Sequence, residues 1–192
     1  MSANAKTLWA CDFFTKRAWT RFGPRVLHVL FFVHLASRRV IVSPATSQPN
    51  REWTSAQARM FLRQANDQGF DPLAILIRDG DGKFGEEFDR ALRARGCQAK
   101  KLPPRSPQLN AFAERWIRSI KRECVDHFVT FGCGHLDYLV EQYVEHYHRE
   151  RPHQGLGNRL IRNTRPPPDP SGRIVRRTRL GGVLKHYERR AA

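Results

Sequence analysis

Three acidic side chains stand at positions where a carboxylate is either costly or well placed for chemistry. Asp12 lies within an aromatic, apolar stretch, where an ionised group needs a compensating partner. Asp79 directly follows the apolar run 73–78, and ligand sites in α/β proteins lie at the carboxyl ends of strands. Glu114 borders the apolar stripe of a predicted amphipathic helix. These three residues are therefore candidates for a shared site.

Each of these carboxylates also has an ordinary interpretation. Asp12 could face water at a strand end or edge, and Asp79 could serve only as a turn residue of the DGDG segment. Asp81, two residues later, competes with Asp79 for the same role. Glu114 could form a surface ion pair with Arg118, which follows it by four residues. The charge pattern alone favours the surface ion pair for Glu114.

Three carboxylates on separate elements suit a site for two Mg²⁺ or Mn²⁺ ions. Hard cations prefer oxygen ligands, and a metal pair stabilises both the attacking and the leaving oxygen in phosphoryl transfer. Arg118 and Lys121 follow Glu114 at i+4 and i+7, on one helix face, where they can grip a phosphate backbone. These residues favour metal-dependent phosphoryl transfer on nucleic acid.

The elements that must position these residues follow from the spacing of apolar side chains. Strands are predicted over 7–15, 26–35, 39–43, 73–78 and 97–102, and helices over 50–68, 85–95, 108–125 and 135–148. Asn50 is a candidate N-cap of the first helix, and Gly69 is its predicted stop. Three strands followed by alternating helices and strands predict an α/β fold with a mixed sheet.

The charge of the chain points to a polyanion as partner. Lys and Arg number 34 against 18 Asp and Glu, which gives a net charge of +16 and a pI near 10.8. Residues 158–192 hold ten basic and two acidic residues, and they include the Pro-rich stretch 166–170. We therefore expect a core over 1–157 and a basic, largely extended tail over 158–192, whose arginines contact phosphates without reading base sequence.

Membrane and secreted classes do not fit the sequence. The longest apolar run, 26–36, is shorter than the roughly 20 residues that a membrane span needs, and the N-terminus lacks a secretory pattern. Four scattered cysteines are typical of a reduced, cytoplasmic protein. A zinc site at Cys124, His127, Cys133 and His135 is not expected, because the second spacing is tight and Cys124 continues an apolar stripe.

A set of motifs carries a resemblance to a known family. Within residues 7–160 the chain contains, in this order, CDFFT, VLFFVHLASRRV, LIRDGDGKF, RSPQLNAFAERWIRSIKRE and EHYHRERPHQGLG. Together they resemble the catalytic core of bacterial insertion-sequence transposases and of retroviral-type integrases. The tail segment RLGGVLKHYERR also resembles the end of such transposases. The resemblance implies a ribonuclease H-like fold, a five-stranded mixed sheet flanked by helices.

The resemblance also implies a DDE triad of metal ligands. Asp12 stands where the family has its first aspartate, on the first strand. Asp79 stands where the family has its second, at the end of the fourth strand and five residues before an aromatic residue. Glu114 matches the glutamate of the family's N-x3-E-R helix, together with Asn110 and Arg115. The implied catalytic and metal-binding residues are thus Asp12, Asp79 and Glu114.

Candidate DNA contacts come from the same resemblance. In retroviral-type enzymes, basic residues four and seven positions after the glutamate grip the DNA end, and Arg118 and Lys121 stand there. The family also carries an RPH segment after the core, present here at 151–153, which is either a DNA or subunit contact or a solvated helix terminus. The predicted DNA-binding residues are Arg105, Asn110, Arg115, Arg118, Lys121, Arg151 and His153.

The function implied is DNA integration or transposition. Metal-activated water would cut a DNA strand, and the exposed 3′-OH would then attack target DNA. We expect homo-oligomers on transposon ends and target DNA in a bacterial cytoplasm. Because about six residues precede the first strand, with no helix-turn-helix region, we interpret the chain as a truncated transposase. The alternatives are a catalytically silent fragment that binds nucleic acid or a partner, and a nuclease of the ribonuclease H type.

Overall fold

A computed structural model describes the backbone of residues 7–70, 74–101, 107–162 and 171–189, and their side chains except those of 107–110. Arg105 and the Pro-rich stretch 166–170 lie outside the described residues, and so does the side chain of Asn110. Within the described ranges, no helix is long and apolar enough to cross a membrane.

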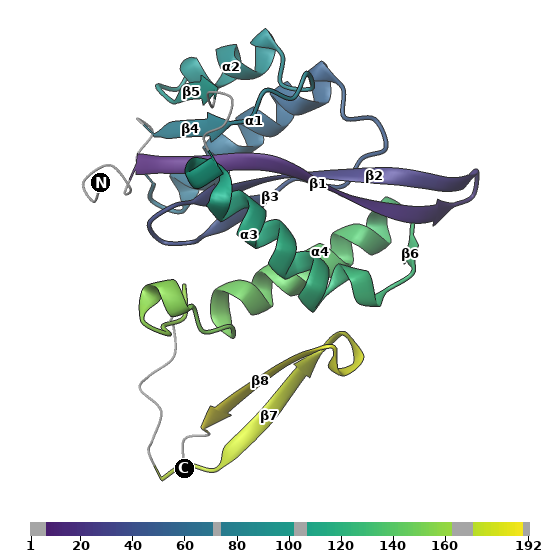
Figure 1. Cartoon of the computed structure of the whole chain (residues 1–192), viewed down its shortest axis with the longest axis vertical. Coiled ribbons are helices and arrows are strands. Elements are labelled where there is room, and N and C mark those ends of the chain that lie inside the picture. The colour runs from purple at the N-terminus through teal and green to yellow at the C-terminus, as the bar shows by residue number, and fades with distance from the viewer. Residues whose placement is uncertain (1–6, 71–73, 102–106, 163–170, 190–192) are drawn as a thin grey trace.

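A mixed β-sheet lies at the centre of the protein (Figure 1). Its strands run in the order β3-β2-β1-β4-β5, and β6 pairs with the far end of β1. β2 is antiparallel to β1 and β3, whereas β4 is parallel to β1 and β5. The strands are β1 Leu8–Thr20, β2 Gly23–His34, β3 Val40–Val42, β4 Ile75–Arg78, β5 Gln98–Lys101 and β6 Thr130–Phe131. The five predicted strands are thus present, and β6 extends the sheet.

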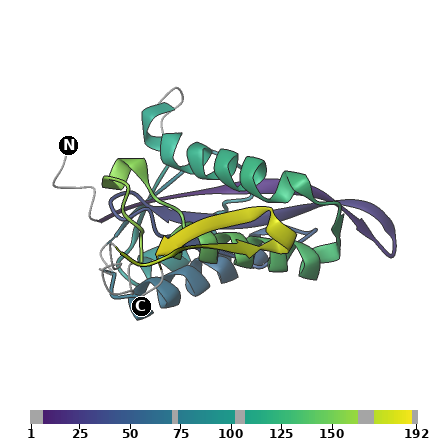
Figure 2. The same ribbon diagram turned by 90° about the horizontal axis from the view of Figure 1, so that it is seen from below.

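Helices cover both faces of this sheet (Figures 1 and 2). They are α1 Arg51–Asp67, α2 Glu86–Arg93, α3 Pro107–Glu123 and α4 Gly132–Arg149. α1 and α2 pack on one face, and α3 and α4 on the other. As predicted, Asn50 caps α1, since its Oδ1 accepts a hydrogen bond from the backbone N–H of Trp53 at 2.8 Å. Gly69, with a φ of 76°, follows the end of α1.

Strand β1 supplies side chains to both hydrophobic layers. Trp9 and Cys11 are buried beneath α1 and α2, whereas Ala10 and Phe14 are buried beneath α3 and α4. Because side chains alternate along a strand, Asp12 belongs to the face of Ala10 and Phe14. The sheet therefore directs Asp12 toward the layer of α3 and α4.

The basic tail contains regular structure that the sequence prediction of a largely extended segment did not specify. β7 (Ile174–Arg179) and β8 (Leu184–Arg189) pair as an antiparallel hairpin that lies across α4 in Figure 2. Leu184 is only 3% exposed and joins the core beneath α3 and α4, so the hairpin packs on the rest of the chain. The turn runs through the short helix Leu180–Gly182, where Gly181 and Gly182 have positive φ. The division into residues 1–157 and 158–192 remains a prediction.

Candidate active site and nucleic-acid interface

The register of two neighbouring strands brings Asp12 and Asp79 together. β1 and β4 are parallel, and their last aligned pair is Cys11 opposite Arg78. Asp12 follows Cys11 within β1, and Asp79 follows Arg78 directly after the end of β4. The two aspartates therefore lie side by side where β4 ends. Burial raises the pKa of the Cys11 thiol well above its usual range, and the negative charges of both aspartates raise it further. Both carboxylates therefore lie close enough to Cys11 for their charges to affect its pKa.

The side chain of Arg78 turns away from this pair. Its Nε donates to Asp89 Oδ1 at 3.0 Å and its terminal nitrogen to Asp89 Oδ2 at 2.7 Å, and Asp89 belongs to α2. Alternation along the strand then places Asp79 on the opposite face, the one that Asp12 shares with α3. Within the described part of the chain, the carboxylate of Asp79 forms no ion pair. Among these residues, its carboxylate accepts a hydrogen bond from the backbone N–H of Asp81.

Asp81, the competing acidic residue, is already engaged. Its Oδ2 lies 2.7 Å from Lys83 Nζ, and its Oδ1 accepts the backbone N–H of Lys83 at 2.9 Å. Burial raises the pKa of Asp81, but the hydrogen bonds and charge of Lys83 outweigh burial and hold that pKa below its usual value. Asp79 Oδ1 in turn accepts the N–H of Asp81 at 3.1 Å, which fixes the turn after β4. The local bonds favour Asp79 over Asp81 as a ligand.

Glu114 comes from α3, which packs against β1, β2 and β4. Its neighbour Ala113 is fully buried, whereas Glu114 itself is exposed. Among the described residues, the carboxylate oxygens of Asp12, Asp79 and Glu114 do not all lie within 4.8 Å of one another. Three carboxylates repel each other without a cation between them, which opposes a tighter arrangement. The structure therefore places Asp12 and Asp79 at neighbouring positions of the sheet, whereas the three carboxylates do not form one compact cluster among the described residues.

The donor set nevertheless suits a magnesium or manganese ion. Asp12 in β1 and Asp79 at the end of β4 are both half-buried and offer carboxylate oxygens as ligands. The helix that carries Glu114 packs against both of these neighbouring strands. Mg²⁺ is bound in proteins by one or two carboxylates and completes its shell with water and substrate phosphates. Asp12 and Asp79 would supply these carboxylates, and Glu114 would reach the same ion from α3.

The predicted DNA contacts on α3 are at the surface. Arg118 is exposed and Lys121 is half-buried, and both follow Glu114 along one edge of the helix. Lys121 lines a surface depression together with Lys16 and Arg17 of β1. These two β1 residues are not among the predicted DNA contacts, although two basic residues that follow an aromatic strand segment are a usable signal.

The remaining described candidates lie around a second depression. Arg115 and Arg151 both line it, and Arg151 also pairs with Glu123, at 2.8 and 2.9 Å. His153 lines this depression as well, although only 5% of it is exposed, and its Nε2 lies 2.7 Å from the carbonyl oxygen of Tyr147. Burial lowers the pKa of His153, and its role in DNA binding remains a prediction.

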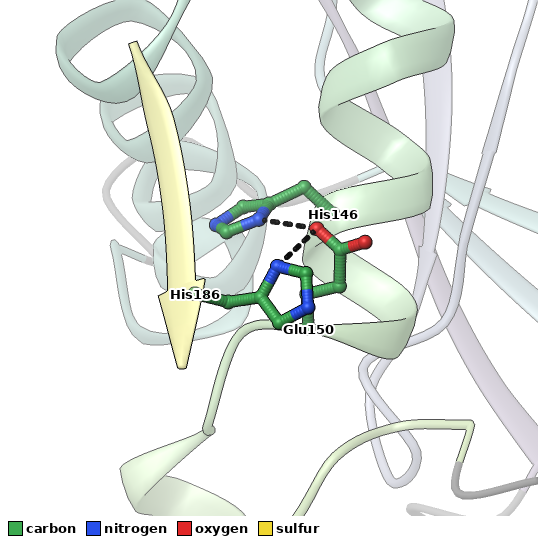
Figure 3. Close-up of side chains that lie close together, drawn as sticks. All are labelled: His146, Glu150 and His186. Atoms are coloured by element: carbon green, nitrogen blue, oxygen red, sulfur yellow. Dashed lines mark hydrogen bonds and ion pairs between the residues drawn. The ribbon is translucent and has the colours of Figure 1, made fainter. Parts of the chain in front are cut away.

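A second polar cluster joins the hairpin to α4, and Figure 3 shows its three members. Glu150 Oε2 lies 3.0 Å from His146 Nδ1 and 3.1 Å from His186 Nδ1 of β8. Arg179 of β7 also donates to Glu150, with contacts of 2.7 to 3.1 Å to its two oxygens. Burial raises the pKa of Glu150, but bonds from Arg179 and His146 and the charge of His186 lower it to about 2.

Two histidines and a glutamate are ligands that zinc accepts. The hydrogen bonds from Arg179 to Glu150 instead indicate a charged cluster that holds the hairpin on α4, here called the clasp (His146, Glu150, Arg179 and His186). The clasp was not foreseen because His186 comes from the hairpin, far along the chain from Glu150. Cys124, from the zinc spacing considered above, is buried, and its Sγ donates to the carbonyl oxygen of Leu139. Burial raises the pKa of Cys124 to about 12, which opposes the thiolate form that binds zinc.

Comparisons of sequence place this chain beside mobile-element proteins. Residues 95–160 match the family model described as an integrase core domain. The putative transposase InsD for insertion element IS2E of Escherichia coli (strain K12) is 31% identical over 101 residues, which are 52% of this chain and 46% of that protein. Transposase InsD for IS2A/D/F/H/I/K of Escherichia coli is also 31% identical over 101 residues, 33% of its length. The chain thus matches less than half the length of these curated relatives.

Solved structures share the fold at low sequence identity. The catalytic core domain of BIV integrase aligns with a TM-score of 0.57 at 13% identity, over 81% of this chain and 91% of that one. The HTLV-2 integrase catalytic core domain, solved in complex with magnesium in a dimeric form, gives 0.55 at 15% identity, over 78% and 90%. The predicted ribonuclease H-like α/β fold is therefore confirmed. This chain is thus similar to insertion-element transposases in part of its sequence and to retroviral integrase catalytic cores in fold.

Proposed function

We propose that this chain is the catalytic core of a DNA transposase, which cleaves and transfers DNA strands with divalent metal ions. The observation that carries the proposal is the placement of Asp12 and Asp79 side by side at the end of β4, within an integrase-type fold. The net charge of +16 supports a polyanion as substrate. The related transposases of insertion elements support DNA as that polyanion.

In this proposal the residues have separate roles. Asp12 and Asp79 hold the metal from two neighbouring strands, and Glu114 completes the site from α3. Two Mg²⁺ or Mn²⁺ ions would activate the attacking oxygen and stabilise the leaving oxygen of the phosphodiester. Arg118 and Lys121, on the same edge of α3, bind the phosphate backbone and orient the strand at the carboxylates.

The partners proposed are DNA and further copies of this chain. One aligned structure is a simian T-cell lymphotropic virus intasome, and another is a dimeric integrase core. The aligned intasome chain covers 96% of this chain at a TM-score of 0.58, with 12% identity. A homo-oligomer on DNA ends is the arrangement that these neighbours favour.

A second candidate is a catalytically silent fragment that binds nucleic acid or a full-length partner. The observation in its favour is that the carboxylate oxygens of Asp12, Asp79 and the exposed Glu114 do not all lie within 4.8 Å of one another among the described residues.

Nicking of supercoiled plasmid in Mg²⁺ or Mn²⁺ separates these candidates. The wild type should nick, Asp12→Asn and Glu114→Gln should lose the activity, and Glu141→Gln should keep it. Glu141 is a matched control because it is an exposed glutamate on α4. Nicking that survives in Asp12→Asn would refute the assigned site. A folded wild type that binds DNA without nicking it would support the silent fragment.

A further inference from the structure

Three arginines from distant parts of the chain line one pocket of about 280 Å³, here called the Arg38 pocket. Arg38 lies in the turn after β2, Arg115 on α3, and Arg151 just after α4. Phe112 and Gly155 also line the pocket. Convergence of three cationic side chains on one concavity is electrostatically costly unless an anion offsets it.

Arg38 is held in place before any ligand arrives. Its φ is 61°, in the left-handed region that non-glycine residues rarely occupy. The guanidinium carbon lies 3.9 Å from the centre of the Phe112 ring, which is a cation–π contact. One terminal nitrogen also donates to the carbonyl oxygen of Leu35. A strained backbone and a fixed side chain are features that cluster at ligand sites.

Acidic residues balance only part of the charge of the pocket, as far as the described residues show. Glu123 pairs with Arg151 through both oxygens, whereas Arg38 and Arg115 form no ion pair among the described residues. Burial lowers the pKa of Arg38, Tyr147 opposes this effect, and the charge of Arg115 lowers the pKa further. The repulsion between Arg38 and Arg115 therefore remains, and an anion between them would relieve it.

We propose that the Arg38 pocket binds a phosphate group of the DNA backbone. A guanidinium presents planar, paired N–H donors that match phosphate oxygens, and Arg38 and Arg115 both keep donors for this purpose. The pocket lies on another face of α3 than the proposed active site, because Phe112, Arg115 and Ser119 follow one helical row and Glu114, Arg118 and Lys121 another. DNA would thus meet α3 on two faces.

This inference rests on DNA being the substrate, as proposed above, but adds Arg38, which is not among the predicted DNA contacts. The alternative is a purely structural role, in which Arg38 holds the turn after β2 against α3 through its contact with Phe112. Arg38→Gln and Arg115→Gln distinguish the two, because exposed Arg115 makes no stack that holds the fold. Arg93→Gln, at an exposed arginine of α2 on the other face of the sheet, is the matched charge control.

Two measurements test the pocket. The first is thermal unfolding in inorganic phosphate and in chloride at equal ionic strength. Phosphate should raise the unfolding temperature of the wild type and of Arg93→Gln, and raise it much less in Arg38→Gln and Arg115→Gln. The second is fluorescence anisotropy of a labelled DNA duplex over a range of salt concentrations. Loss of one phosphate contact should reduce the salt slope by about 1, and weaken binding roughly eightfold near 0.1 M salt.

The outcomes separate the pocket from the proposed function. If wild type binds DNA but Arg38→Gln keeps the salt slope and phosphate response of Arg93→Gln, the pocket is overturned and the transposase proposal stands. If phosphate stabilises the protein through Arg38 and yet the DNA slope does not change, the ligand is a free anion and the backbone contact is overturned. Loss of both responses in Arg38→Gln and Arg115→Gln, but not in Arg93→Gln, is the result expected.

Discussion

Mild acid should destabilise this protein through His148. The ring lies in α4 and is only 4% exposed, and its Nε2 accepts the backbone N–H of Val40 at 2.9 Å. The ring must be neutral to accept this bond. Burial, and the charges of Arg162 and Arg39 after it, lower the pKa of His148 from 6.5 to about 3.

The size and direction of the effect follow from this shift. The unfolded chain binds a proton at His148 below about pH 6.5, whereas the folded protein binds it only near pH 3. The stability from His148 is therefore complete above pH 6.5 and is lost as the pH falls toward 3. Each pH unit in this window corresponds to about 1.4 kcal/mol, so acidification from about pH 7.5 to 5 should cost about 2 kcal/mol through His148 alone.

Urea unfolding of the wild type and of His148→Gln, at about pH 7.5 and 5, measures this contribution. Glutamine offers an acceptor near the position of Nε2 but does not titrate. On acidification, wild type should lose about 2 kcal/mol more unfolding free energy than the variant. The pKa of His153 is also lowered by burial, but His153 is present in both proteins, so its contribution cancels. Equal losses in the two proteins would refute the assignment to His148.

Further substitutions test the carboxylates, the clasp and the core. Asp79→Asn should abolish metal-dependent plasmid nicking and Asp81→Asn should not; the reverse result would reassign the ligand. Glu150 has its pKa lowered to about 2, so its contribution is present above about pH 4.5 and lost toward pH 2. Glu150→Gln should therefore cost on the order of 3 kcal/mol in urea at neutral pH and expose the hairpin to hydrogen exchange, and an unchanged exchange rate would contradict the clasp with Arg179. Phe61→Ala removes a buried ring stacked on a neighbouring phenylalanine at 4.2 Å, and should cost about 3–5 kcal/mol in the same denaturation assay.

Apolar runs and helical spacing predicted the sheet and its helices, but they did not predict where elements with polar or glycine-containing ends begin and end. The first strand was expected to end at 15, whereas β1 continues to Thr20 and pairs with β2 down to Gly23. The strand was predicted too short because Lys16 and Arg17 are consecutive charged residues, which interrupt the alternation of apolar and polar side chains that marks a strand. The last long helix begins at Gly132 and not at 135, since glycines there carry no helical signal.

The part of the candidate site that lies at the end of one strand could be predicted from the sequence. Asp79 follows an apolar strand, and this local pattern was enough to place it at the carboxyl edge of the sheet. Arg38 lies in a turn where neither apolar periodicity nor charge spacing marks it as a binding residue, and its neighbours Arg115 and Arg151 come from α3 and from the end of α4. Such a convergence depends on packing across the whole chain, which no short stretch of sequence contains.

The distribution of ion pairs explains why Asp79 stands out in so basic a protein. Asp89 is paired with Arg78, Asp81 with Lys83, and Glu150 with Arg179. The strand directs Arg78, the chain neighbour of Asp79, to α2 on the opposite face of the sheet. Asp79 therefore stays half-buried without an ion pair among the described residues, although basic residues outnumber acidic ones nearly two to one. The lack of an ion pair at Asp79 among the described residues, where other acidic residues have one, is the electrostatic basis for proposing it as a metal ligand.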